Sequence, residues 1–486
     1  MKKIITGIFT AMLMCTMAVS CYTEHSTSLG GSEGPAVIYP DYKNVTIPTN
    51  IAPVNYRYAM EGASSATTTF STGEKSVTLH GTAVKWNLKK WKRFIEGTEG
   101  KTIEVKAYVK AKGKNIEDSW SIYVSEDKVD SYLTYRLIEP AFQMWNEVSI
   151  EERCIENFDR NTICDYNVTD NSCMNCHIHG QQRGDLSMYY IRGAKGGAIL
   201  NRDGQLRKLN LRAGDMISGT VYGEIHPSGR FGVFSTNVII PGLHTMAQKR
   251  TEVYDTASDL TVADFDSNRM INLPHTARAD KFETFPCFSA DGESVFYCVA
   301  DTLPVPQDVD KLRYHLVRVS FDSNTGEMGT QVDTVWNADI HNASACHPKA
   351  SPDGKWVMFT VADYGTFPIS HYESALQMVN LETGEICTLE GLNGNNSNTF
   401  HSWSSDSHWF VFASKRGDGQ YSKPYFCHID ENGNPSKPFV LPQKSPHFYD
   451  TFLKSFNVPD LGRESTGLTT GDAKRMVNME SEAFSD

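Results

Sequence analysis

The chain has 486 residues, of which 21% are charged and 11% aromatic, and its formal net charge is −12. This length favours two or three domains, and the composition is that of a globular protein rather than a disordered one. An acidic chain without a stripe of lysine and arginine has no electrostatic footprint for nucleic acid, so we expect no nucleic-acid partner.

The first twenty residues are typical of an export signal. Lys2 and Lys3 precede an apolar run from residue 4 to residue 20 that is too short for a membrane span. Ala18-Val19-Ser20-Cys21 resembles the modification site of bacterial lipoproteins, in which Cys21 would carry the lipid. The alternative is an ordinary signal peptide with a leftover cysteine. Residues 21–35, rich in Ser, Thr and Gly, predict a flexible tether.

Residues 36–130 alternate between strand-like and turn-like stretches. The stretch from residue 101 to residue 111 places Ile103, Val105 and Val109 on one face, which predicts a half-buried strand. A short helix is expected between Asn87, a plausible N-cap, and Gly97. The simplest interpretation is a small immunoglobulin-like β-sandwich.

Residues 131–184 are expected to be a linker that holds a cysteine motif. Cys173-Met-Asn-Cys176-His177 has the spacing of covalent haem attachment, in which both thiols bind the porphyrin and His177 binds the iron. The sixth iron ligand must come from elsewhere, and His244 is the first choice. An open sixth position is also possible and would favour small-ligand chemistry. Further candidates for this ligand are Met246, His226, His275, His347 and His401.

Other chemistries remain open for the same cysteines. Zinc prefers four ligands, which Cys154, Cys164, Cys173 and Cys176 could supply, although the first two are not closely spaced. Cys154 and Cys164 could instead form a disulfide or stay as buried thiols. A redox dithiol is disfavoured because the βαβ context is missing.

Residues 185–455 repeat a pattern of a tight turn followed by an aromatic-rich strand. Gly229, Gly292, Gly354 and Ser407 align at the turns. Repeats of four short strands predict a β-propeller, here with five or six blades, because each repeat leaves apolar faces that only its neighbours cover. A pair of β-sandwiches is the alternative. The fold class is therefore all-β. The polar residues 456–486 are expected to be a disordered tail.

Ser351-Pro352-Asp353-Gly354-Lys355 matches the turn of TolB-like propellers, and the other repeats match it in part. Together with the lipoprotein signal and the cysteine motif, the chain resembles TolB-like lipoproteins of the Bacteroidetes type. The resemblance implies the propeller fold and an exported, membrane-anchored protein in the periplasm or outer membrane. It implies no substrate, because propellers serve many functions.

The residues that precede the turns in each repeat are expected to line the propeller channel. Phe285, His347 and Phe400 align with Tyr222, and His401 falls in the next column. These rings could bind a ligand at the mouth, or they could pack blade against blade. The chain contains no Gly-x-Ser-x-Gly elbow, which disfavours a hydrolase and leaves enzymatic activity undecided.

Two functions are consistent with these features. The first is an exported lipoprotein with one covalent haem that transfers electrons to envelope partners or senses redox state. The second is a non-enzymatic propeller scaffold that binds a peptide, glycan or protein partner in the cell envelope, with the cysteine segment purely structural.

Overall fold

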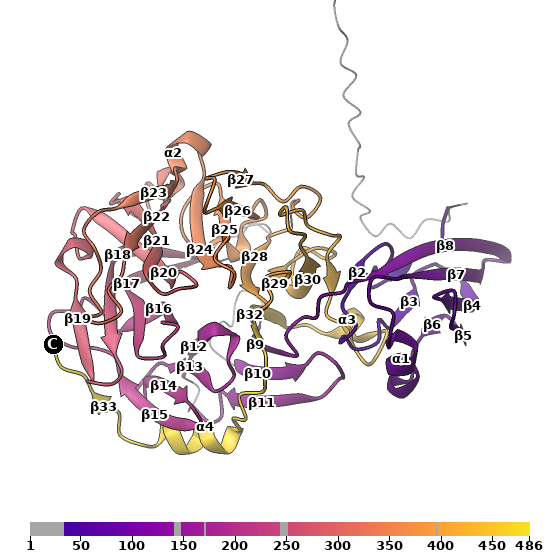
Figure 1. The fold of residues 1–486 in the computed structure, drawn as a ribbon, viewed down its shortest axis with the longest axis horizontal. Coiled ribbons are helices and arrows are strands. Elements are labelled where there is room, and N and C mark those ends of the chain that lie inside the picture. Colours follow the sequence, from indigo (N-terminus) through magenta and orange to yellow (C-terminus); the bar gives the residue numbers. More distant parts are fainter. Residues whose placement is uncertain (1–33, 140–146, 170–171, 244–250, 395) are drawn as a thin grey trace, which may run out of the picture.

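The computed structural model describes residues 34–139, 147–169, 172–243, 251–394 and 396–486. The expected signal peptide, Cys21 and most of the tether lie outside the described residues, and so does His244. The side chain of Cys176 is also outside them, although its backbone lies in a strand. The described chain is mostly β and forms two parts, a small N-terminal part and a larger ring of sheets (Figure 1).

The N-terminal part contains a five-stranded sheet and a three-stranded sheet. In β7 the residues Ile103, Val105, Ala107 and Val109 are buried, which confirms the predicted half-buried strand. Its elements are β1 (Ile38–Tyr39), β2 (Thr46–Ile47), β3 (Tyr56–Tyr58), β4 (Ala63–Ser71), β5 (Ser76–His80), β6 (Ala83–Val84), α1 (Leu88–Ile95), β7 (Thr102–Ala111) and β8 (Lys114–Val124).

Helix α1 begins and ends where the sequence predicted. The side chain of Asn87 accepts hydrogen bonds from the backbone N–H groups of Lys89 and Lys90, so it caps the helix. Gly97, just beyond the C-cap, has φ of +72°. The helix buries Trp91, Phe94 and Ile95 against the sheets.

The larger part consists of strand groups in chain order around a centre (Figure 1). A parallel pairing of Ser258 with Phe282 joins two of the groups into one eight-stranded sheet. The strands are β9 (Tyr132–Ile138), β10 (Ser149–Cys154), β11 (Arg160–Asp165), β12 (Met174–His179), β13 (Leu186–Ile191), β14 (Gly197–Arg202), β15 (Gln205–Asn210), β16 (Thr220–Ile225), β17 (Phe231–Leu243), β18 (Thr251–Asp264), β19 (Arg269–Asn272), β20 (Lys281–Phe288), β21 (Ser294–Asp301), β22 (His315–Ser320), β23 (Asp333–Trp336), β24 (Ser344–Ala350), β25 (Trp356–Ala362), β26 (Ala375–Asn380), β27 (Ile386–Cys387), β28 (Thr399–Trp403), β29 (Trp409–Ser414), β30 (Lys423–His428), β31 (Phe439–Val440), β32 (Ser455–Gly462) and β33 (Glu482–Ala483).

Short helices join some of these strands. They are the α-helices α2 (Ala338–His341), α3 (Phe448–Thr451) and α4 (Thr470–Val477) and the 3₁₀ turns Gly180–Gln182, Pro274–Thr276, Val309–Lys311 and Pro368–Ser370. Within the described residues, no helix is both long and apolar enough to span a membrane.

The expected linker at 131–184 and the expected polar tail at 456–486 both contain ordered strands. β9, β10 and β11 form one sheet with β32, so residues from both ends of the larger part pair with each other. β12, which contains the cysteine motif, is the first strand of the next sheet. Composition misled the prediction because β10 buries charged residues, Glu151, Glu152 and Arg153, whose type suggests a surface segment.

The C-terminal residues also form a helix. Thr469 and Asp472 form a capping box at the start of α4, and the helix buries Met476 and Val477. β33 then pairs in parallel with β15. The prediction that residues 456–486 are disordered is therefore wrong. A few apolar residues are enough to pack this polar segment against the ring.

The repeated turns have the backbone conformation that their residues suggested. Gly229, Gly292 and Gly354 have φ of +73°, +76° and +74°, and Ser407 takes the same place with φ of +65°. Turns of neighbouring sheets also touch, since the backbone N–H of Asp353 donates to Oγ of Ser407 at 2.9 Å. The repeats are therefore equivalent in structure as well as in sequence.

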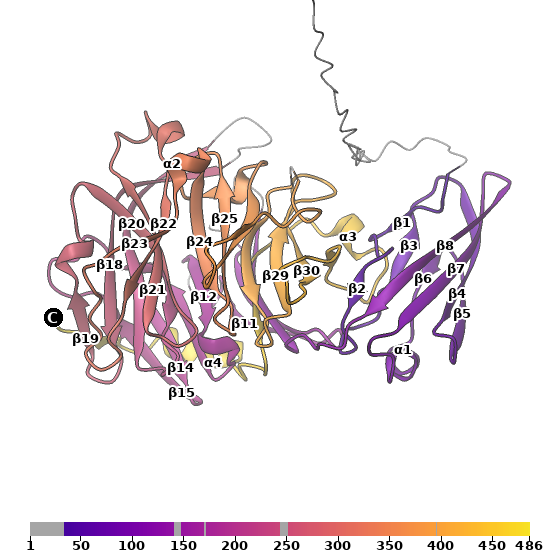
Figure 2. The same ribbon diagram turned by 45° about the horizontal axis from the view of Figure 1, so that its top comes forward.

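The two parts share one apolar core. Val129 and Tyr42 from the first part belong to the same buried cluster as Trp409 and Phe439 from the last sheets of the ring. Seen from the side, the N-terminal sheets lie beside β29 and β30 (Figure 2). Asp130 strengthens this contact, because its carboxylate accepts hydrogen bonds from the backbone and the hydroxyl of Ser405.

Candidate functional site

The innermost strand of each sheet carries a bulge at the same level. The pairing register shifts in β12, β16, β20, β24, β28 and β32, and these strands surround the centre of the ring (Figure 1). A bulge re-aims the side chains of the strand that contains it. Phe285, His347, Phe400 and Val458 adopt positive φ at these bulges.

Aromatic rings at these bulges form a continuous row from one sheet to the next, which we call the aromatic row. The centroids of Tyr222 and Phe285 are 4.4 Å apart, those of Phe285 and His347 4.2 Å, and those of His347 and Phe400 4.3 Å. The structure thus brings together the residues that aligned in the repeats. The row packs neighbouring sheets against each other along the strands that surround the centre of the ring.

His347 and His401, the two histidines predicted to lie at the mouth of the propeller, differ in their surroundings. Neither ring nitrogen of His347 has a hydrogen-bond partner, and burial lowers the pKa of His347 to about 3. His401 donates from Nε2 to the carbonyl of Met358 at 2.9 Å, and burial lowers its pKa to about 3. Both are therefore neutral, and His401 bridges two sheets rather than joining the row.

A charged cluster lies next to the aromatic row, in the residues that follow the bulges. Nζ of Lys349 is 3.5 Å from Oε1 of Glu224. Asp460 accepts hydrogen bonds from the hydroxyl of Ser402 at 2.7 Å and from the backbone of His179 at 3.0 Å. Burial disfavours the charge on Lys349, but Glu224 and Asp460 outweigh it and raise the Lys349 pKa. This cluster was not predicted from the sequence. The only feature that its members Glu224, Lys349 and Asp460 share is that each follows a bulge.

A pocket of about 500 Å³ adjoins Tyr222, at one end of the row. The turn between β13 and β14 contributes Arg192, Gly193, Ala194 and Gly196 to its wall. A Cβ on Gly193 would lie 2.3 Å from Oγ of Ser172, so only glycine allows this close approach. The other walls come from residues 210–212 and 218–222, and from Asn237, Ile239 and Ser481.

Two arginines of this pocket form no salt bridge with any residue that the structure describes. Arg192 is half-buried, Arg212 is exposed, and both line the cavity. Within the described part of the chain, neither guanidinium forms a salt bridge, whereas arginines such as Arg183 and Arg207 do. This pair was not predicted from the sequence, because no sequence pattern indicates that two arginines twenty residues apart line one pocket.

The cysteine motif lies mostly within β12. Cys173 is half-buried, and its carbonyl accepts a hydrogen bond from the backbone of Arg192 at 2.9 Å. Met174 is fully buried. His177 is 1% exposed, neither of its ring nitrogens has a partner, and burial lowers its pKa to about 4. His177 is therefore a neutral imidazole enclosed by protein.

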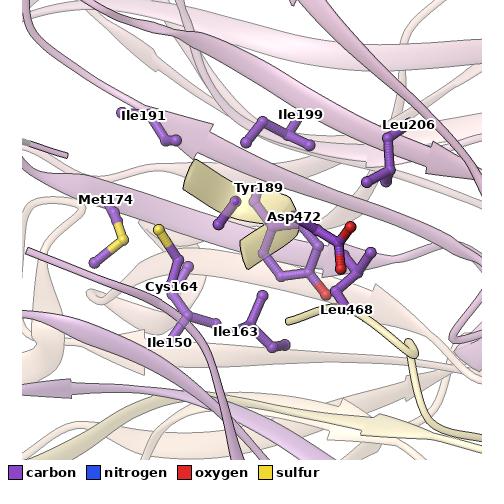
Figure 3. A pocket seen from close by; sticks show the side chains of 11 residues that line it. Ile150, Ile163, Cys164, Met174, Tyr189, Ile191, Ile199, Leu206, Leu468 and Asp472 are labelled. Carbon is purple, nitrogen blue, oxygen red and sulfur yellow. The ribbon is translucent and has the colours of Figure 1, made fainter. Parts of the chain in front are cut away.

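This arrangement does not fit a haem. An iron ligand needs open space beside one ring nitrogen for a whole porphyrin, and protein atoms cover both nitrogens of His177. A ligand of that size needs a pocket of roughly several hundred Å³. The cavity beside Met174 holds about 10 Å³ and is lined mostly by apolar side chains such as Tyr189 and Ile163 (Figure 3). His244, the expected second ligand, lies outside the described residues.

The same register separates two of the cysteines considered for zinc. On the hairpin of β10 and β11, Cys164 pairs with Ile150, while Cys154 lies at the far end of β10. Four residues along a strand correspond to roughly 13 Å. One zinc ion cannot bind both, and no disulfide can join them. Both are free thiols in the structure.

A buried histidine also links the start of β18 to the residues that follow β25. Nε2 of His371 is 2.7 Å from Glu252, Nδ1 is 3.1 Å from Glu373, and the ring of Tyr364 packs 4.8 Å away. Burial alone would lower the pKa of His371, but the hydrogen bonds and charges of Glu252 and Glu373 raise it to about 9. His371 is therefore a cation that holds residues 363–374 against β18.

We predict that the motif carries no covalent haem. The full chain, co-expressed with the machinery that attaches haem to cytochromes c, should give a colourless band when stained for haem after denaturing electrophoresis. The reason is that His177 is enclosed by protein on both nitrogens. A cytochrome c from the same cells is the positive control. A stained band that disappears in Cys176→Ser would contradict the prediction.

We predict that His371 makes stability depend on pH. Its pKa is higher in the folded state than the ordinary 6.5, so its contribution is complete below pH 6.5 and is lost as pH rises through about 9. At about 1.4 kcal/mol per pH unit, this contribution is roughly 3 kcal/mol. Urea unfolding across this range should show a fall that is absent in His371→Gln.

The half-exposed His315 serves as the control for this measurement, because its nearest carboxylate lies 3.9 Å away. His315→Gln should keep the fall seen in the wild type. A free-energy difference between the wild type and His371→Gln that stays constant with pH would show that His371 is not charged.

No protein-family model and no curated protein matches this chain. Among solved structures, it is similar to TolB from Acinetobacter baumannii, with 11% identity, 77% of this chain and 85% of that chain covered, and a TM-score of 0.44. A putative TolB from Agrobacterium tumefaciens has 12% identity, with 66% and 94% covered and a TM-score of 0.37. A hypothetical selenium-binding protein from Sulfolobus tokodaii has 8% identity, with 71% and 96% covered and a TM-score of 0.44.

Proposed function

We propose that this chain is an exported, non-enzymatic propeller scaffold that binds a carboxylate-bearing peptide in the pocket beside Tyr222. The observation that carries the proposal is the pair Arg192 and Arg212, which line a cavity of about 500 Å³ without a salt-bridge partner in the described part of the chain. In this proposal the ring is a six-bladed propeller closed by β32, and residues 36–130 form an immunoglobulin-like sandwich.

The chemistry of the pocket favours a carboxylate. A guanidinium presents several N–H donors in a planar fork that matches a carboxylate in two hydrogen bonds. The chain as a whole is acidic, with a net charge of −12, so two arginines in one cavity that form no salt bridge with a described residue are a local exception. A ligand that brings negative charge would balance them.

The size and the walls of the pocket favour a peptide. A cavity of about 500 Å³ is in the range that encloses a ligand of a few residues. Tyr190 and Tyr222 offer aromatic faces, while Asn210, Ser218 and Asn237 offer donors and acceptors for a backbone. The aromatic row continues from Tyr222 to Phe285 on the neighbouring sheet and would extend the contact.

The same walls favour binding over catalysis. Among the described residues that line the pocket there is no aspartate, glutamate, histidine, lysine or cysteine. Such a pocket has hydrogen-bond donors but no side chain with a pKa suited to general acid or base catalysis. Electron transfer through a haem has only the Cys173–His177 motif in its favour, so the scaffold is the better supported function.

Export and lipid attachment through Cys21 belong to the same proposal and rest on the sequence of residues 1–21. We expect the full chain, expressed in a bacterium, to enter the detergent phase on partitioning, and Cys21→Ser to leave it because the acylated thiol is lost. Cys15→Ser is the matched control and should behave like the wild type. Equal partitioning of Cys21→Ser and the wild type would exclude lipid attachment at Cys21.

The pocket is tested with short peptides rich in tyrosine and glutamate, made with a free or an amidated C-terminus. We expect binding in isothermal titration calorimetry, and weakening of about tenfold or more in Arg192→Gln and in Arg212→Gln. The reason is that a hydrogen bond to a charged group contributes about 1.5–3 kcal/mol. The amidated peptide should bind more weakly than the free acid.

Arg278→Gln is the matched control, because Arg278 is exposed and forms a 2.6 Å salt bridge with Asp280 away from the pocket. It should bind the peptides like the wild type. The proposal fails if the pocket variants retain full affinity, or if no peptide of the set binds the wild type.

A further inference from the structure

Two histidines and an aspartate meet where the N-terminal part contacts the ring. Asp127 follows β8 in the first part, His408 lies in the turn before β29, and His428 ends β30. Asp127 and His428 are 301 residues apart in the sequence. No sequence motif predicts this cluster, because its members come from separate parts of the chain.

The three side chains converge with metal-binding geometry. One ligand atom from each lies within 4.8 Å of the others. Nε2 of His428 is 2.8 Å from Oδ2 of Asp127, and the two imidazole rings stack with centroids 6.3 Å apart. Ligand atoms around a tetrahedral zinc ion are about 3.3 Å apart, given bonds of about 2.0–2.1 Å. Small side-chain rotations would therefore place all three atoms on one ion.

Neighbouring groups hold the three side chains in place. Nδ1 of His408 lies 3.4 Å from the carbonyl oxygen of Ile429, and a proton on this nitrogen leaves the lone pair on Nε2 free for a metal. The hydroxyl of Ser125 donates to Asp127 at 3.2 Å. Nε1 of Trp409 donates to the carbonyl of Asp127. Such support of the first ligands is typical of metal sites.

We propose that Asp127, His408 and His428 bind one divalent transition-metal ion, with Zn²⁺ as the preferred ion. Two imidazole nitrogens and one carboxylate oxygen form a donor set that suits zinc, and water would complete the tetrahedron. The side chains of His428 and Asp127 keep 20% and 35% of their exposure, so an ion can enter from solvent. The site is independent of the peptide pocket.

The position of the site gives it a structural consequence. Asp127 belongs to the N-terminal part, whereas both histidines belong to the last sheet of the ring. An ion bound by all three therefore cross-links the two parts beside the apolar cluster that contains Val129 and Trp409. Binding only to the folded arrangement stabilises it, so the temperature of unfolding should rise with Zn²⁺.

The test uses Zn²⁺ and the full chain after removal of metal by a chelator. Calorimetry should give one ion per chain, and His408→Asn and His428→Asn should each weaken binding at least tenfold. Asparagine keeps a polar side chain at the site, and circular dichroism without metal checks that each variant is folded. Zn²⁺ should raise the unfolding temperature of the wild type and leave that of both variants unchanged.

His447→Asn is the matched control, because His447 is exposed and pairs with Asp450 rather than with this cluster. X-ray absorption of the zinc-loaded wild type should show nitrogen and oxygen ligands with two imidazoles. Sulfur ligands would overturn the proposal by placing the ion at the cysteines instead. Unchanged affinity in both histidine variants, or no binding to the wild type, would show that His428 and Asp127 form only a hydrogen-bonded pair.

Discussion

The pairing of β32 with β9 is the contact on which the larger part depends. It runs from Ser455 opposite Ile138 to Gly462 opposite Tyr132, and so joins residues more than 300 positions apart. Each sheet of such a ring leaves apolar faces that only its neighbours cover, which makes the closed ring the stable form. The same pairing also places the carboxylate of Asp460 where it accepts hydrogen bonds from the hydroxyl of Ser402 and the backbone N–H of His179.

The repeated bulge links this architecture to chemistry. At the same level of six strands, the extra residue re-aims one side chain, and the result depends on which residue stands there. Aromatic residues at Phe285, His347 and Phe400 give the aromatic row, and Tyr222 connects that row to the arginine pocket. The repeated bulge thus places a packed row of rings next to the arginine pocket.

The repeats, the aligned turn glycines, the cap at Asn87 and the alignment of the aromatic row were all predictable from the sequence. The identity of the cysteine segment was not. Cys173-x-x-Cys176-His177 has the spacing of haem attachment, but β12 buries Met174 and encloses His177. The spacing of the motif shows only that its residues are close in sequence. Whether a haem has room beside them depends on the sheets that pack around the strand.

By itself the sequence determined the local features of this protein, because turns, caps and strand alternation depend on the conformations of a few neighbouring residues. Gly354 takes its positive φ and Ile103 its buried face for such local reasons. Tertiary structure alone decided which distant side chains meet. Arg192 and Arg212 line one pocket, and Asp127 contacts His428, because the packing of the sheets places their backbones, and no local preference contains that information.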